Sequence, residues 1–320
     1  VFSVPVSIKD SQPAASAWPG GVIAGAILAS GLTLWQWSTI AGVRSFNIFF
    51  FSLLTLLAFI WAKQNQQRQP AAERTLYWLA FSVGLSLAHH RTTVFYLPSL
   101  VGWIAWYEPR IFKQPVRILK LAVLTLIPLL LYAFIYWRGT NNPPYTHEPI
   151  YDWQSFWFLV GSGDSTGLFL SIDPAFLTAR LYFIWLDLLQ QAARPGLVLA
   201  LIGAGLLLWK RTAHFVFLAV LVVLLLLFTL DFEVVNLDEA PTWYLMPAYL
   251  VVAVWAGVGV NGLLEIGMGL YTSRFKPGAR PALKTQFAVQ LIYTVLLLAI
   301  VGYFLTRPNW HWQFQAATSP

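Results

Sequence analysis

Long apolar stretches recur from one end of the chain to the other, with short polar connections between them. Residues 215–230 read FVFLAVLVVLLLLFTL, which is continuously apolar and lacks the alternation of a barrel strand. A helix of about 20 apolar residues spans a bilayer. The pattern therefore predicts an all-α, polytopic transmembrane helical bundle. We predict nine apolar segments, at residues 22–40, 46–62, 76–88, 92–107, 118–137, 196–209, 214–230, 242–263 and 286–305.

The composition agrees with a membrane protein and removes several other classes. Of the 320 residues, 58% are hydrophobic and 10% are charged, whereas soluble domains are about 25% charged. The chain has no cysteine, which excludes disulfides and thiol chemistry. Its net charge of +7 fits basic loops that face anionic lipid, and no feature indicates nucleic acid as a partner. We treat residues 1–320 as a single transmembrane domain.

The distribution of charge predicts which loops face the cytoplasm. Fourteen of the 20 basic residues lie near the N-terminus or in and beside four loops, and nine of the 13 acids lie in the other connections. Because cytoplasmic loops are rich in Lys and Arg, this split places the N-terminus inside and residues 138–195 and 231–241 outside. We expect a membrane-parallel amphipathic helix around residues 175–192. The four basic loops are 63–75, 108–117, 210–211 and 264–285.

Two neighbouring segments are short for a membrane span. Residues 76–88 and 92–107 reach roughly 20–24 Å by helix rise. Together they predict a hairpin whose tip carries His89, His90 and Arg91. This tip is expected to point outward, in a depression below the membrane surface that opens to the outside.

Several polar residues on the predicted outer side suit a phosphorylated, amphiphilic ligand. Arginine stays charged and grips phosphate oxygens with two N–H groups, which makes Arg44, Arg91 and Arg138 candidates for phosphate binding. The histidines at the hairpin tip can donate hydrogen bonds, ligate a metal or relay protons. Acids in the second external loop can act as a general base or hold a divalent metal. The acids concerned are Asp231, Glu233 and Asp238.

A purely structural interpretation of these residues stays open. At a hairpin tip an arginine can extend to the interface and a histidine can cap a helix end. Acids in an external loop can simply be solvated. His89 and His90 are adjacent, so on a helix they point about 100° apart, which disfavours one metal shared by both. The sequence therefore implies no certain cofactor, and a divalent metal remains an open alternative.

Four stretches, taken in order, resemble a bacterial family of polytopic proteins. They are WSTIAGVRSFNIFFFSLLTLLAFIWA, GLSLAHHRTTVFYLPSLVGW, NNPPYTHEPIYDWQSFWFLVGSG and DEAPTWYLMPAYLVVAVWAGVGV. That family is related to protein O-mannosyltransferases and belongs to the C-type membrane glycosyltransferase superfamily. The resemblance covers residues 18–263.

The resemblance implies a function and a location. Such enzymes transfer a sugar from a polyprenyl-phosphate carrier to an acceptor at the outer membrane face. By this likeness Arg91, in the HHRT stretch, lies near the donor phosphate, and the stretch containing Tyr145 borders the acceptor side. The expected partners are a polyprenyl-phosphate-linked sugar and membrane lipid. The expected location is the bacterial inner (plasma) membrane, as a multi-pass protein.

Two departures from the family pattern keep a second function open. The family usually carries a catalytic Asp-Ser-Gly-Glu motif in a first external loop, and this chain has only KDSQPAA at residues 9–15. Gly42 stands where the family commonly has a glutamate. Either the catalytic loop precedes the sequence given, or the protein is a non-catalytic, glycosyltransferase-like subunit of a larger membrane complex. A transporter for a lipid-linked anion is a third reading, although the internal repeat typical of transporters is missing.

Overall fold

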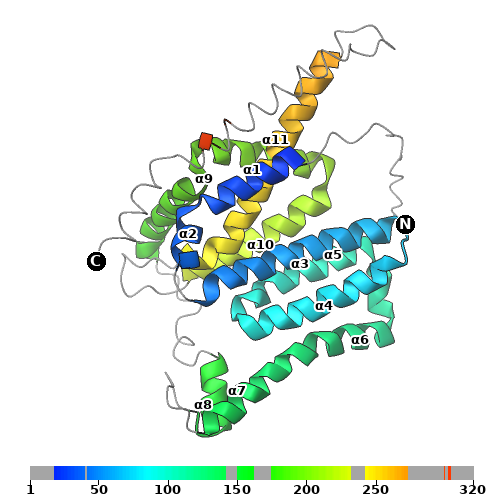
Figure 1. Cartoon of the computed structure of the whole chain (residues 1–320), viewed down its shortest axis with the longest axis vertical. Coiled ribbons are helices and arrows are strands. Elements are labelled where there is room, and N and C mark those ends of the chain that lie inside the picture. The colour runs from blue at the N-terminus through cyan, green and yellow to red at the C-terminus, as the bar shows by residue number, and fades with distance from the viewer. Residues whose placement is uncertain are drawn as a thin grey trace.

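The computed structural model describes residues 18–39, 42–141, 150–161, 174–231, 242–272, 299 and 302–303. Within these ranges the chain is helical and contains no strand, as predicted. Figure 1 shows long helices packed side by side. The elements are α1 (Trp18–Ala29), α2 (Leu32–Thr39), α3 (Val43–Gln66), α4 (Ala71–His89), η1 (Arg91–Phe95), α5 (Tyr96–Tyr107), η2 (Pro109–Lys113), α6 (Pro115–Leu126), η3 (Ile127–Leu130), α7 (Leu131–Thr140), α8 (Trp153–Gly161), α9 (Pro174–Lys210), α10 (Thr212–Asp231), η6 (Thr242–Leu245) and α11 (Met246–Thr272).

Fewer helices qualify as membrane spans than the nine predicted segments. Within the described ranges, five helices are long and apolar enough to cross a membrane, or six if α1 and α2, which meet at a 62° bend, form one span. Neither α4 nor α5 qualifies, and the segment 286–305 lies almost entirely outside the described residues. The number nine is therefore not confirmed. The five helices are Val43–Gln66, Pro115–Thr140, Leu177–Lys210, Thr212–Leu230 and Thr242–Gly267.

The predicted hairpin is present, but one of its arms is longer than predicted. Helix α4 has 19 residues, because its first turn includes the polar residues Glu73 and Arg74, which an apolar pattern leaves out. It reaches about 28 Å by helix rise. Helix α5 has 12 residues and is short, as predicted. The two arms are joined by η1, so the tip is a tight helical turn.

Two groups of buried side chains hold the bundle together. The larger lies between α3, α4, α5, α10 and α11, and includes the fully buried Trp61 and Tyr96. The smaller joins α1, α9 and α11. In the second group the backbones approach closely at glycines: Gly20 lies against Gly257, and Gly203 lies against the carbonyl of Trp255. Small residues allow such contacts between membrane helices.

Helices α6 and α7 form an arm at the edge of the molecule, at the bottom of Figure 1. The arm packs mainly on α4, where the carbonyl of Thr125 meets the backbone of Gly84. Of the most apolar 18-residue stretch of the arm, only 6% is buried inside the protein, against 50% for the corresponding stretch of α3. Its exposed side chains include Leu119, Leu130 and Phe134. In a membrane this surface would face lipid.

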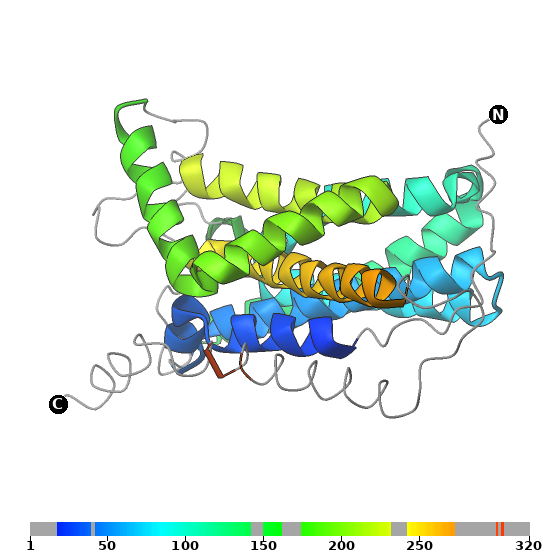
Figure 2. The ribbon, with the colours of Figure 1, turned by 90° about the horizontal axis from the view of Figure 1, so that it is seen from above.

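Helix α9 consists of two legs that diverge, as the green helix in Figure 2 shows. The break falls at Ala193, whose φ of 54° and ψ of 166° are not helical, and Pro195 follows inside the helix. Proline removes a backbone donor and clashes with the preceding turn, which explains the break. The helix predicted around residues 175–192 is therefore present. Its orientation relative to the membrane stays a prediction.

The contacts sort the described loops into two ends of the bundle. At the first, which we call the Arg44 end, the rings of Trp37 and Trp243 meet, and so do those of His90 and Tyr244. At the second, the Arg117 end, residues 64 and 65 contact residues 75 and 107, and Lys210 pairs with Glu265. The ring of His214 contacts that of Tyr107, so the described parts of the basic loops share this end. Which end faces the cytoplasm stays a prediction.

Candidate functional site

His90 is held in one tautomer by the turn that joins α4 to η1. Its backbone is extended, and its Nδ1 accepts hydrogen bonds from the backbone N–H of Thr92 at 3.3 Å and from the Thr92 hydroxyl at 2.8 Å. Asn47 Nδ2, from α3, donates to the same hydroxyl at 3.0 Å. Because a backbone N–H can only donate, Nδ1 carries no proton, and the neutral ring carries its proton on Nε2.

The electrostatic surroundings keep His90 uncharged. Burial, and then the positive charge of neighbouring basic side chains, lowers the pKa of His90 to about 4. Arg91 is the next residue along the chain, and Arg44 packs on Trp243, whose neighbour Tyr244 contacts the His90 ring. At neutral pH His90 therefore offers a neutral N–H donor in the neighbourhood of two cations, which is a combination that suits an anion.

Arg91 is exposed and lies at the start of η1. Its Nη1 donates to the carbonyl of Val160 at 2.9 Å, in the last turn of α8. This contact caps a helix C-terminus, where carbonyls lack partners and a cation is favoured. Among the described residues no carboxylate forms an ion pair with Arg91. One N–H of its guanidinium is used in this bond, so the group retains donors for a ligand.

Arg44 lies in the first turn of α3, over two tryptophan rings that contact each other. Its guanidinium carbon is 3.5 Å from the ring centroid of Trp37 and 4.3 Å from that of Trp243. Cation–π attraction of this kind holds the charge without neutralising it. Gly42, where the family commonly has a glutamate, is the N-cap of α3 in an extended conformation and supplies no side chain to Arg44.

His89 is engaged in packing. Its Nε2 lies 3.0 Å from the carbonyl of Val43, so that nitrogen is a donor. Its ring also packs on Phe46 and Phe50, at centroid distances of 4.9 and 5.5 Å. The two histidines of the tip thus differ: His89 joins α4 to α3, whereas His90 is held by Thr92 within its own turn.

The remaining candidates are not gathered at this point by the described contacts. Arg138 is exposed in the last turn of α7, away from any contact with the two other arginines that the structure records. Tyr145, Glu233 and Asp238 lie outside the described residues, as does the side chain of Asp231. Much of the predicted depression beneath residues 138–195 likewise falls outside the described ranges.

The structure adds a carboxylate that sequence reasoning did not select. Asp187, on the first leg of α9, is half-buried and accepts hydrogen bonds from the hydroxyls of Thr33 and Tyr249. The charge distribution predicts that residues 138–195 lie outside, and Asp187 falls within that range. An acid in a segment as apolar as 177–210 is a signal that could have marked it, because ionisable groups in membrane helices are usually functional.

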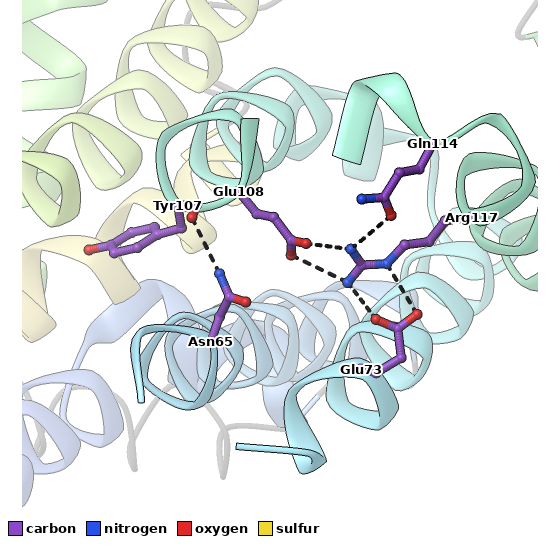
Figure 3. A network of polar contacts seen from close by, with 6 residues as sticks. All are labelled: Asn65, Glu73, Tyr107, Glu108, Gln114 and Arg117. Atoms are coloured by element: carbon purple, nitrogen blue, oxygen red, sulfur yellow. Dashed lines mark hydrogen bonds and ion pairs between the residues drawn. The ribbon is translucent and has the colours of Figure 1, made fainter. Parts of the chain in front are cut away.

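The opposite end holds a closed polar network, drawn in Figure 3. Arg117 on α6 forms ion pairs with Glu73 at 2.5 Å and with Glu108, and also contacts Gln114. Nearby, Asn65 donates to the carbonyl of Tyr107 at 3.3 Å. An open hollow of about 390 Å³ adjoins this network and is lined by Tyr77, Val116 and Lys120 among others. At this end the Arg117 guanidinium is neutralised by Glu73 on α4 and by Glu108, the residue before η2.

The described residues do not assemble a metal centre. No group of three His, Asp or Glu side chains among them is placed to hold a metal ion. His89 and His90 have ring centroids 6.4 Å apart and use their nitrogens differently. The acids predicted as metal ligands have side chains outside the described ranges, so a divalent metal stays a prediction for them.

The long apolar helices, with apolar side chains exposed over much of their surface, define an integral membrane protein of the all-helical class. Within that class, residues 5–111 match the family model described as Protein O-mannosyl-transferase TMEM260 N-terminal domain. The chain is also 29% identical over 136 residues to Protein O-mannosyl-transferase TMEM260 of Mus musculus.

These matches cover part of each protein. The alignment with the mouse protein covers 42% of this chain and 17% of the mouse protein. No solved structure matches the chain significantly. Both Arg44 and Arg91 fall inside the matched residues 5–111. The findings support the predicted relationship to O-mannosyltransferases, whereas the bacterial source stays a prediction.

Proposed function

We propose that the protein is a membrane glycosyltransferase that moves a sugar from a polyprenyl-phosphate donor to an acceptor at the outer membrane face. The likeness to a protein O-mannosyl-transferase supports a glycosyltransferase role. The observation that carries the proposal is the pair of arginines at the Arg44 end, Arg44 and Arg91, neither of which is neutralised by a carboxylate among the described residues.

The geometry suits the departure of a phosphate. When the bond from the sugar C1 to the phosphate oxygen breaks, negative charge collects on the phosphate. Arg91 and Arg44 would stabilise that charge, and the Nε2–H of His90 would donate a hydrogen bond to it. The donors are fixed before the ligand arrives: Arg44 by two tryptophans and His90 by Thr92. Preorganised donors are the more effective ones because little rearrangement is needed.

Further roles in this proposal follow the resemblance and the charge pattern. His89 and Arg138 would line the donor side, and Tyr145 would border the acceptor. One of Asp231, Glu233 and Asp238 would take the proton of the acceptor hydroxyl. The ligands would be a polyprenyl-phosphate-linked sugar and surrounding membrane lipid, in a multi-pass protein of the bacterial inner membrane.

Removing the exposed guanidinium tests the donor site. Full-length protein in lipid nanodiscs should consume polyprenyl-phosphomannose, and Arg91→Ala should lose about 2–4 kcal/mol of transition-state stabilisation, measured as kcat/KM. Arg91→Lys should retain part of the activity, since the charge stays. Arg180→Ala is the matched control, because Arg180 also caps a helix end, by donating to the Leu230 carbonyl. Equal losses in both variants would remove the phosphate role of Arg91.

A non-catalytic subunit is the second candidate. It is favoured by the bonds that the tip residues already make: Arg91 to Val160, His89 to Val43 and Arg44 to its tryptophans. Each of these contacts would serve a purely structural protein equally well. Wild-type protein that binds polyprenyl phosphate but never consumes the sugar donor would favour this reading over the first.

A further inference from the structure

The open hollow at the Arg117 end contains a lysine that forms no ion pair within the described residues. The hollow measures about 390 Å³ and lies between α4 and α6. Tyr77 lines it from α4, and Val116 and Lys120, four positions apart and hence on one face, line it from α6. The side chain of Lys120 is exposed, and none of the ion pairs recorded in the described ranges involves it. The hollow therefore holds a positive charge that a ligand could neutralise.

The acids beside the hollow do not cancel this charge, because Arg117 binds them (Figure 3). Glu73 contacts Arg117 with both carboxylate oxygens, at 3.1 and 2.5 Å, and Glu108 pairs with the same guanidinium. Residues 73–74 and 108–120 together carry five bases and two acids, which gives a net charge of +3. The electrostatic surroundings of the hollow therefore favour an anion over a cation.

The lining of the hollow supplies donors that suit a phosphate group. The ammonium of Lys120 has three N–H donors, and lysine is a common ligand of phosphates. Gln114 also lines the hollow. Its Oε1 accepts a hydrogen bond from Arg117 at 3.4 Å, so the NH₂ group of the same amide remains to donate elsewhere. A charged donor and a neutral donor thus lie on the wall of one hollow.

The position of the hollow along α6 favours a membrane lipid over a soluble phosphate. The hollow is lined by residues between Pro115 and Lys120, which begin the candidate span Pro115–Thr140. Six helical residues rise about 9 Å, which is comparable with the headgroup layer of roughly 5–7 Å on each side of a bilayer. Beyond Lys120 the exposed side chains of α6 are apolar and include Val123 and Leu126. A phospholipid places its phosphate and its acyl chains at these same two depths.

We propose that the hollow binds an anionic phospholipid, with the phosphate on Lys120 and Gln114 and the acyl chains along the exposed face of α6. Basic pockets between membrane helices bind anionic headgroups in this way. The bound lipid would bridge α4 and the arm formed by α6 and α7, beside the Arg117 network. The hollow lies at the opposite end of the bundle from Arg44 and Arg91, so this inference does not depend on the proposed function.

The test titrates delipidated protein in detergent micelles with phosphatidylglycerol or phosphatidylcholine and measures the bound lipid by native mass spectrometry. Wild type should bind the anionic lipid at least about fivefold more tightly, the factor that one basic side chain contributes near a membrane surface. Lys120→Gln should lose about fivefold in affinity for phosphatidylglycerol, and Lys120→Arg should stay within about twofold because the charge remains. Lys63→Gln is the matched control, since Lys63 is an exposed lysine at the same end that does not line the hollow.

Each outcome of the titration decides the inference. A selective loss of phosphatidylglycerol in Lys120→Gln, with the thermal midpoint of the lipid-free protein unchanged, would support it. Equal binding of the two lipids by wild type would overturn it. Equal losses in Lys120→Gln and Lys63→Gln would also overturn it, because general surface charge would then attract the lipid. Glycerol 3-phosphate should not displace the lipid at equal concentration, and displacement would assign the hollow to a soluble phosphate and contradict the proposed lipid.

Discussion

The two ends of the bundle differ in the partners that they give to arginine side chains. At the Arg117 end the guanidinium contacts two carboxylates and a glutamine, and the network closes on itself. At the Arg44 end one guanidinium lies over two aromatic rings, and among the described residues the other donates to a backbone carbonyl. A neutralised cation has its electrostatic attraction satisfied within the protein, whereas an unneutralised one retains it for an incoming anion. The difference separates a structural arginine from candidate binding arginines.

The strongest test of this comparison is Arg117→Ala. Arg117 is largely buried, with 16% of its side chain exposed, and its loss would leave Glu73 and Glu108 facing each other without a cation. We expect a loss of about 3 kcal/mol in the free energy of unfolding, measured by denaturant titration in detergent. Lys120→Ala is the control, since Lys120 lines the same hollow. If Arg117→Ala lost less unfolding free energy than Arg44→Gln, the comparison would be contradicted.

Acidification should destabilise the folded protein through His90, at the Arg44 end. Its pKa is lowered to about 4 in the folded protein, from an ordinary value of 6.5. Between these values the unfolded chain binds more protons than the folded one, so stability rises with pH across this window and falls on acidification. After allowance for partial exposure we expect a loss of about 2 kcal/mol from pH 7 to pH 4.

His90→Gln separates this residue from other groups that titrate in acid. The variant lacks the imidazole, so the difference in unfolding free energy between it and wild type should shrink or reverse as the pH falls. Donor binding should not strengthen between pH 7 and pH 5, since His90 stays neutral there. An identical pH dependence in both proteins would show that His90 is protonated without cost.

The smallest effect is expected for Arg44→Gln. Removing the cation between Trp37 and Trp243 should cost about 1 kcal/mol of stability, because cation–π contacts at partly exposed sites are weak. The same change should weaken binding of polyprenyl phosphate vesicles by more than Arg117→Gln does, provided that both variants are compared well below their thermal midpoints. A binding loss that only follows stability would assign Arg44 a structural role.

The sequence predicted the helical class and the grouping of loops from simple physics. Continuous apolar runs require helices in lipid, and the clustering of Lys and Arg predicted that the basic loops share one end, as their described parts do. The bounds of α4 were missed because Glu73 and Arg74 are polar yet helical. The count of nine spans was not confirmed because an apolar segment, such as the one in α5, can be too short to qualify.

For the site, the sequence identified residue types but not their partners. HHR marked the hairpin tip, yet only the structure divides its roles between a packed His89 and a His90 fixed by Thr92 and Asn47. Asp187 escaped notice because its partners, Thr33 and Tyr249, lie 154 and 62 positions away. Contacts over such separations depend on helix packing, which local patterns do not encode.

The two sides of the exposed arm formed by α6 and α7 should differ in their tolerance of substitutions. Its outward side chains, such as Leu119 and Leu130, meet no shape-defining neighbour in the described protein, so exchange among leucine, valine, isoleucine and phenylalanine should pass with little consequence. On its inward side the arm packs on Gly84 of α4, and any side chain at that position would strike the Thr125 carbonyl of the arm. Variation between homologues should therefore be dense on one flank of the arm and sparse on the other.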